Sequence, residues 1–218
     1  MKGVLAFVCC LAMFIINEQP VVLNAADWHA TAEKLSQSVV FVETSEGSCT
    51  GFVVNSNWTR DKDQPDADLV MTAAHCKGPD LFVDNQVAKV IFKDTKHDLM
   101  ILLVDDTGRP ALTIAKDDPE QGQEVVSYGF GAALSKPMFR LAHVSIVDIT
   151  IPDIDGGPFV MIDAGYVGGQ SGGPVINADG EVVSIVQRAN GLLGIGVGAE
   201  IIRDKAKRYL EKPKPAKP

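Results

Sequence analysis

Short runs of β-branched and other apolar residues, separated by polar or glycine-containing stretches, recur along most of the chain. Such runs between turn signals are typical of β-strands. In the first half they predict strands at 38–43, 49–55, 69–72, 87–92 and 99–104, and in the second half at 124–128, 139–151, 159–162, 174–176, 182–187 and 193–199. A polar connector over about 105–120 separates the two sets. The pattern therefore predicts an all-β protein with two lobes.

Two segments show a helical pattern instead. The segment 27–37 has Asp27 at its start, where a carboxylate can cap the first turn, and it predicts a short amphipathic helix before the first strand. The segment 200–210 places Ile201, Ile202 and Leu210 among charged residues, which predicts a second helix near the C-terminus.

The first 26 residues have the pattern of a secretory signal peptide. Lys2 precedes an apolar run over 3–16, and the small residues Ala25 and Ala26 stand where cleavage is expected. An uncleaved anchor is the alternative, although the run is short for a membrane span. We expect the mature protein to be secreted or periplasmic, with no stable membrane span after cleavage.

Composition and charge fit a globular protein with an acidic body. The chain has 218 residues, 46% of them hydrophobic, which is enough for a sizeable core. Its formal net charge is −8, and the segment from Arg203 onward is basic, so the rest is more acidic still. An acidic body argues against non-specific nucleic-acid binding. The Lys/Pro tail within 204–218 is expected to be solvated and disordered; docking on an acidic surface or anionic lipid is the alternative.

Three motifs carry the candidate chemistry: TAAHC, HDLMILLV and GGQSGGP. They place His75, Asp98 and Ser171 in that order along the chain. A serine hydroxyl needs an imidazole to accept its proton and a carboxylate to orient that imidazole. The backbone N–H groups of Gly169 and Ser171 could form an oxyanion hole where glycine leaves the approach open. Each motif alone is ordinary, but the ordered set indicates acyl transfer.

At these motifs, from about Ser38 to Arg203, the chain resembles the chymotrypsin-like (trypsin-fold) serine peptidases. The resemblance implies an all-β fold of two Greek-key six-stranded β-barrels with the active site between them and a C-terminal helix. Lobe one would span about 38–104 and lobe two about 121–199, within a protease domain at 27–203 and with no further domain after it.

The resemblance implies a secreted or periplasmic serine endopeptidase, a hydrolase that cleaves polypeptides through the triad and an acyl-enzyme. The alternative is an exported peptide-binding pseudoprotease that keeps the barrel fold. The intact triad positions favour the enzyme.

After loss of the leader, only Cys49 and Cys76 remain of the four cysteines. The pair matches the family disulfide beside the catalytic histidine, and two free buried thiols are the alternative. The sequence has no CxxC or HExxH motif, so it gives no support for a metal site, and no cofactor is expected.

The resemblance also suggests how substrate is selected. Gly165 stands six residues before Ser171, where trypsin-like members place an acid, so a Lys or Arg preference is not supported. Val186 should narrow the pocket, which predicts a small or medium aliphatic P1 residue. The strand 183–187 would lie along the bound peptide, and Ser184 would hydrogen-bond Asp98.

Two neighbours of the triad complete the expectations. Zymogen members have an aspartate before the nucleophile, whereas this chain has Gln170 and lacks an IVGG-like start. Here it resembles the Deg (HtrA-type) branch more closely, so we expect local loop packing to set the oxyanion hole. His97 would alternate with Asp98 on a strand and is expected to face solvent.

Overall fold

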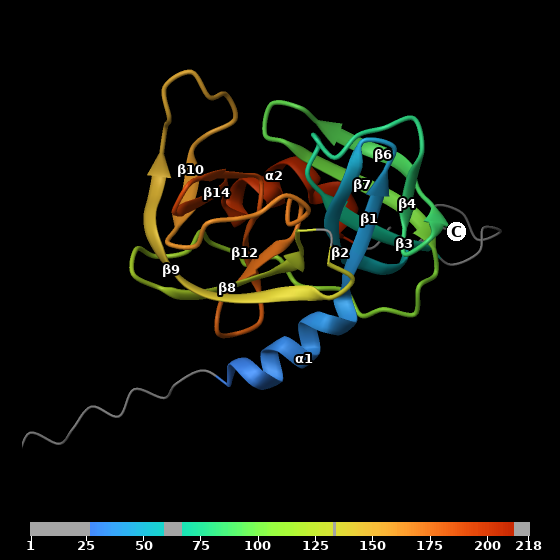
Figure 1. Cartoon of the computed structure of the whole chain (residues 1–218), viewed down its shortest axis with the longest axis horizontal. Helices are drawn as coiled ribbons and strands as arrows, with labels where there is room; N and C mark the ends of the chain where they lie inside the picture. Colours follow the sequence, from blue (N-terminus) through green and yellow to red (C-terminus); the bar gives the residue numbers. More distant parts are fainter. Residues whose placement is uncertain (1–26, 59–66, 133, 212–218) are drawn as a thin grey trace, which may run out of the picture.

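The structure is a computed structural model, and it describes residues 27–58, 67–132 and 134–211 (Figure 1). The predicted signal peptide at 1–26 lies outside the described residues, as does most of the predicted Lys/Pro tail, at 212–218.

The described chain folds into two antiparallel sheets that lie side by side (Figure 1). The first sheet has the order β5-β4-β1-β2-β3-β7-β6, and the second has the order β12-β11-β8-β9-β10-β14-β13. The first contains β1 (Val39–Thr44), β2 (Gly47–Trp58), β3 (Ala67–Thr72), β4 (Leu81–Val83), β5 (Gln86–Val87), β6 (Lys89–Asp94) and β7 (Leu99–Asp105). The second contains β8 (Glu124–Phe130), β9 (Pro137–Ile149), β10 (Phe159–Ile162), β11 (Pro174–Ile176), β12 (Val182–Ile185), β13 (Arg188–Asn190) and β14 (Leu193–Val197). The predicted two-lobed β architecture is confirmed.

Each sheet has seven strands, where the resemblance implied six and the sequence pattern predicted five in the first half and six in the second. The first sheet gains the β4-β5 hairpin, whose strands have only three and two residues and which turns at Asp84 and Asn85, with φ of 46° and 70°. Positive φ at both central residues is what a tight two-residue hairpin requires. In the second sheet the predicted strand 182–187 ends at Ile185, and β13 begins at Arg188. Strands this short leave little pattern in the sequence.

Both predicted helices form. In α1 (Trp28–Ser38) the Asp27 side chain accepts a hydrogen bond from the Ala30 N–H at 3.0 Å, so it caps the first turn as predicted. α2 (Ala199–Leu210) contacts strands of both sheets. Its Tyr209 hydroxyl donates to the Ile91 carbonyl at 3.0 Å, and Asn55 Nδ2 donates to the Tyr209 carbonyl at 3.0 Å. α2 therefore ties the second lobe to the first.

Two strands of the first sheet, β1 and β2, carry buried residues on both faces. On β1, Val39 belongs to a large core shared by both lobes and both helices, whereas Val40 and Val42 belong to a separate core of the first lobe. On β2, Phe52 faces the shared core and Val53 the separate one. Burial on two faces explains why these strands read as continuous apolar runs instead of alternating ones.

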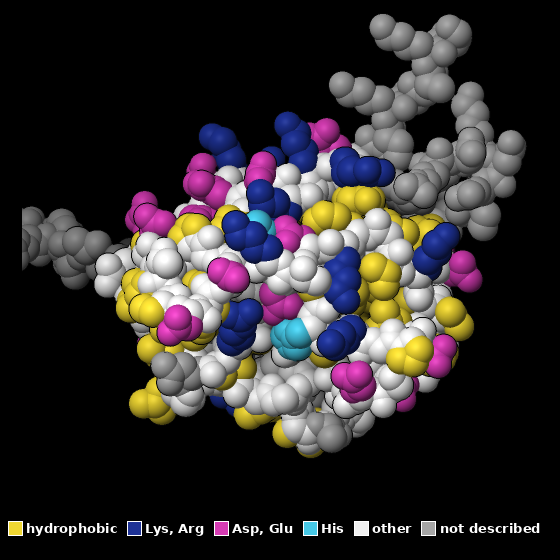
Figure 2. Space-filling view, turned by 90° about the horizontal axis from the view of Figure 1, so that it is seen from above, with side chains coloured by type: hydrophobic (Ala, Val, Ile, Leu, Met, Phe, Trp, Pro, Cys, Tyr) yellow, Lys and Arg dark blue, Asp and Glu magenta, His cyan; other side chains and the backbone are white. Residues whose placement is uncertain are grey.

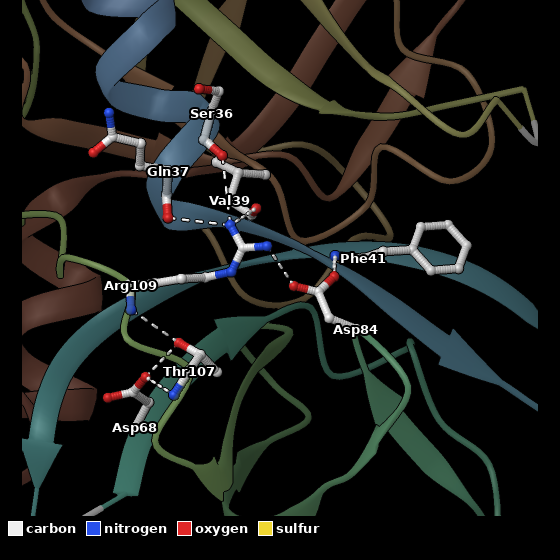
Figure 3. Close-up of polar contacts among 8 residues, drawn as sticks. All are labelled: Ser36, Gln37, Val39, Phe41, Asp68, Asp84, Thr107 and Arg109. Atoms are coloured by element: carbon white, nitrogen blue, oxygen red, sulfur yellow. Dashed lines mark hydrogen bonds and ion pairs between the residues drawn. The ribbon is translucent and has the colours of Figure 1, made fainter.

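The connector between the lobes also anchors α1 (Figure 3). One guanidinium nitrogen of Arg109 donates to the backbone carbonyls of Gln37 and Val39, at 3.1 and 3.4 Å, and the other pairs with Asp84 at 2.8 Å. The second Asp84 oxygen accepts from the Phe41 N–H at 3.0 Å. A cation at the carbonyl end of a helix is favourable, so this contact fixes the end of α1 against the first lobe.

Candidate active site

His75 and Asp98 lie on two loops of the first lobe, after β3 and before β7. Asp98 Oδ2 is 2.7 Å from His75 Nδ1, and Asp98 Oδ1 accepts from the His75 backbone N–H at 2.8 Å. The Asp98 side chain is 8% exposed and the His75 side chain 45% exposed. Both carboxylate oxygens therefore hold one histidine, which makes Nδ1 the donor and leaves Nε2 to accept a proton.

The turn that carries Asp98 is fixed by the second lobe. Asp98 has a left-handed backbone with φ of 54°. Gln187, which is buried, donates from Nε2 to the carbonyls of His97 and Asp98 at 2.7 and 3.1 Å. Sequence reasoning missed Gln187, although a polar residue that ends the apolar run VVSIV was a usable signal.

The expected role of Ser184 is wrong. Its hydroxyl donates to the Val197 carbonyl at 2.8 Å and makes no hydrogen bond to Asp98 among the described residues. Ser184 lies within β12, and its side chain faces β14 of the same lobe. The chain reaches the Asp98 turn only after β12 has ended, at Gln187.

The prediction that His97 faces solvent is also wrong. Its side chain is 11% exposed, and its Nδ1 lies 2.6 Å from Asp94 Oδ2. The residue belongs to the turn before β7, so strand alternation does not apply to it. Burial favours the neutral Asp94 carboxyl, but hydrogen bonds from the side chain and backbone of His97 outweigh burial and lower the pKa of Asp94.

Ser171 lies in a glycine-built turn of the second lobe between β10 and β11. Gly169 and Gly172 have φ of +99° and +85°, which L side chains rarely adopt. A Cβ on Gly172 would lie 2.2 Å from Thr72 Oγ1, so glycine is also needed for space. Within the described chain, the N–H groups of Gly169 and Ser171 donate no hydrogen bond. Both remain available to a ligand, as an oxyanion hole requires.

Thr50, on β2 of the first lobe, holds this turn from the other side of the lobe boundary. Its N–H donates to the Ser171 carbonyl at 2.8 Å, and its hydroxyl donates to the Gly169 carbonyl at 2.8 Å. The same hydroxyl accepts from the Phe130 N–H at 2.9 Å. Thr50 is fully buried. It therefore fixes the backbone on both sides of Gln170, and nothing in the sequence pattern pointed to it.

Gln170 packs inside the turn. It is fully buried, and its Oε1 accepts from the Val167 N–H at 3.0 Å. The Gln170 N–H donates to the Val167 carbonyl at 3.1 Å. These two bonds close the loop over 167–170 without any charged group.

A disulfide joins Cys49 to Cys76, with a Cα–Cα distance of 6.2 Å. In the sequence Cys49 directly precedes Thr50, and Cys76 directly follows His75. Cys76 Sγ lies 3.8 Å from the Ser171 carbonyl oxygen. The histidine loop and the Ser171 turn therefore meet at the bridge. In the described part of the chain, no hydrogen bond joins Ser171 Oγ to His75; such bonds are often long without substrate.

Two cavities flank this junction. One of about 130 Å³ is lined by Ser171, Val186 and Gln187, among others. Another of about 440 Å³ is lined by His75 and Asp98 and shares Gln187 with the first. Val186 therefore lies beside Ser171 in one cavity wall, and its role in substrate selection stays a prediction.

The expected role of Gly165 is not supported by the geometry. It does not line the cavity beside Ser171; it lines a separate hollow with Arg140, which donates to the Gly165 carbonyl at 2.8 Å. A Cβ at Gly165 would lie 2.4 Å from the Gly191 carbonyl oxygen. Gly165 therefore lies against the loop at Gly191 and not in the wall of the Ser171 cavity.

Over 27–58, 67–132 and 134–211, no group of three or more His, Cys, Asp or Glu side chains is placed to hold a metal ion. Neither described helix is long and apolar enough to cross a membrane.

The family profile of the trypsin-like peptidase domain matches residues 49–185, more than half of the chain. The chain belongs to this family. The match contains the His75 and Asp98 loops and the Ser171 turn. The predicted resemblance to trypsin-fold peptidases is confirmed.

The relatives include DegP-like and HtrA-type proteases, in line with the predicted likeness to that branch. A probable periplasmic serine endoprotease, DegP-like, from Halomonas elongata is 34% identical over 125 residues, which is 52% of this chain and 25% of that protein. The chain thus matches about a quarter of the length of this relative. The active form of the Rv3671c protease from M. tuberculosis is 22% identical with a TM-score of 0.68, covering 99% of this chain and 97% of that one. The HtrA-type protease AlgW with tripeptide is 16% identical with a TM-score of 0.71, covering 84% and 64%. At these identities the two structures show a common fold.

Proposed function

We propose that this protein is a serine endopeptidase that uses Ser171 as nucleophile, His75 as general base and Asp98 to orient the histidine. The observation that carries the proposal is the pair of hydrogen bonds that Asp98 accepts from His75. Beside them lies the turn with positive-φ glycines that presents Ser171. Membership of the trypsin-like peptidase family supports it.

The reaction proceeds in two halves. Ser171 Oγ attacks the carbonyl carbon of the substrate while His75 Nε2 takes the hydroxyl proton. The N–H groups of Gly169 and Ser171 stabilise the oxygen that becomes negative. His75 then protonates the leaving amine, and the acyl group remains on Ser171. Water activated by His75 attacks the ester and releases the acid. One oxyanion donor contributes about a hundredfold to a thousandfold in rate.

The cavity beside Ser171 supports a preference for a small or medium aliphatic P1 residue. Its volume is about 130 Å³, and the branched Val186 side chain stands in its wall. We propose that this cavity receives the side chain whose carbonyl Ser171 attacks.

Three observations support a secreted or periplasmic location. The sequence at 1–26 has the pattern of a signal peptide. The Cys49–Cys76 disulfide is of a kind that persists in oxidising compartments. The DegP-like relative carries the word periplasmic in its name.

The test is to incubate the protein with an unfolded polypeptide and to sequence the products by mass spectrometry. We expect cleavage at internal bonds after small or aliphatic residues. Ser171→Ala should lose several orders of magnitude in rate, with an unchanged circular dichroism spectrum. Undiminished cleavage by Ser171→Ala would remove Ser171 from its role. Peptide binding without any cleavage would favour the pseudoprotease.

A further inference from the structure

The cavity beside His75 is rich in cationic side chains. Lys77, Lys93 and Arg188 line it together with His75 and the hydroxyl-bearing Thr95. Figure 2 shows histidine side chains near the middle of one face of the molecule, with Lys and Arg side chains around them. The clustering contrasts with a chain whose net charge is −8.

The positive charge of this cavity is not neutralised from within. Asp98 is the one carboxylate among its described lining residues, and both of its oxygens are bound to His75. The nearby Asp94 is similarly committed to His97 and the backbone of its own turn. Across the described ranges, Lys77, Lys93 and Arg188 form no ion pair. The cavity therefore presents cations without a carboxylate partner.

The cavity adjoins the one beside Ser171, because Gln187 and Arg188 line both. Arg188 begins β13, which is the edge strand of the second sheet. An extended peptide that pairs with this edge points successive side chains to opposite sides. If one side chain enters the Ser171 cavity, the preceding residue points toward His75.

We propose that the cavity beside His75 is a subsite for a carboxylate side chain, so that the enzyme prefers Asp or Glu immediately before the P1 residue. The inference rests on the proposed peptidase function. Ammonium and guanidinium groups, together with a hydroxyl donor, form charge-assisted hydrogen bonds with a carboxylate. The carboxylate of a substrate Asp or Glu would give Lys77, Lys93 and Arg188 an anionic partner.

The experiment compares four fluorogenic peptides that share one small aliphatic P1 residue. One pair carries Glu or Gln directly before P1. The second pair keeps Gln there and places Glu or Gln four residues further toward the N-terminus, so that net charge is matched. We expect kcat/KM to be about two- to fivefold higher for Glu than for Gln in the first pair, and about equal in the second. At 1 M salt, where the Debye length is about 3 Å, the first ratio should fall toward one.

Variants assign the preference to the cavity. Lys93→Gln and Arg188→Gln should each lower the Glu-to-Gln ratio, and the double variant should lower it further. Lys116→Gln is the matched control, because Lys116 is exposed and lines neither cavity. It should leave the ratio unchanged. Every variant should still be labelled by a fluorophosphonate, which shows that Ser171 remains reactive.

The outcomes separate this subsite from the peptidase function itself. Suppose that the wild-type protein cleaves the peptides and is labelled by the fluorophosphonate. A Glu-to-Gln ratio near one in the first pair then overturns the subsite but leaves the proposed peptidase function in place. Equal ratios in the two peptide pairs also overturn it, because they would reflect overall charge. Absence of both cleavage and labelling overturns the proposed function, and the subsite with it.

Discussion

The two lobes contribute to the site by different means. In the first lobe, His75 is held by hydrogen bonds to a buried carboxylate, Asp98. In the second lobe, Ser171 is presented by a backbone turn whose glycines have φ values that other residues avoid. The first arrangement depends on side-chain chemistry and the second on chain geometry. Substitutions should therefore affect the two halves in different ways.

The largest effect on activity is expected at Asp98, whose carboxylate orients His75, the general base. Asp98→Asn should lower kcat/KM by about four orders of magnitude, because an amide imposes the wrong tautomer on His75. Asp94→Asn is the matched control, since Asp94 makes a similar contact to His97 on the same turn. We expect less than a tenfold loss for this control, measured by peptide hydrolysis. Equal losses in the two variants would show that general damage to the turn, and not orientation of His75, is being measured.

The next effect concerns the glycine turn. Gly172→Ala should lower both activity and the free energy of unfolding, because its Cβ would lie 2.2 Å from Thr72 Oγ1 and 2.3 Å from the Thr50 carbonyl oxygen. Gly122→Ala provides the control: its φ is +86°, close to that of Gly172, but nothing lies within 4 Å of its Cβ. It should cost about 1 to 2 kcal/mol in urea unfolding and keep full activity. Similar losses in the two variants would contradict a steric role for Gly172.

A smaller effect on activity should follow when the contact between Thr50 of the first lobe and the Ser171 turn of the second lobe is weakened. Thr50→Val removes the hydroxyl that joins Gly169 to Phe130 and leaves buried backbone groups unpaired. We expect a loss of about 1 to 3 kcal/mol in the free energy of unfolding, and a tenfold or larger fall in kcat with KM little changed. Thr50→Ser keeps the hydroxyl and should restore kcat. If serine fails to rescue, Thr50 acts through packing and not by positioning the turn.

The smallest effect is expected from the N-terminus. A zymogen-type activation needs an ion pair to a newly formed amine, whereas Gln170 is uncharged and already bonded to Val167. Mature protein that begins near Asp27 and a form with a short N-terminal extension should therefore hydrolyse peptides at the same rate. A large gain that appears only on trimming to one residue would contradict the local packing of this loop.

Much of this comparison was predictable from the sequence. The long apolar strands and the Asp27 cap are local signals, and the structure places them as expected. The motifs around His75, Asp98 and Ser171 are local signals as well, and their catalytic roles stay a prediction. The β4-β5 hairpin was missed because its strands are too short to show a period.

The contacts between distant segments could not be predicted. Thr50 and Gly169 are 119 residues apart, and Gln187 and Asp98 are 89 apart. These contacts depend on how the two lobes pack together, and a local sequence pattern does not predict that packing. The expectation for Ser184 was wrong for the same reason, since a shift of three residues decides which side chain reaches the Asp98 turn.

The most direct test of the account is the chemical reactivity of Ser171. The protein would be treated with a fluorophosphonate, digested, and mapped by mass spectrometry. We predict one adduct, on Ser171, which is lost in Ser171→Ala and strongly reduced in His75→Ala while both variants remain folded. An adduct on another serine, or an unreactive Ser171 in the folded wild-type protein, would contradict the claim that the two lobes together activate this residue.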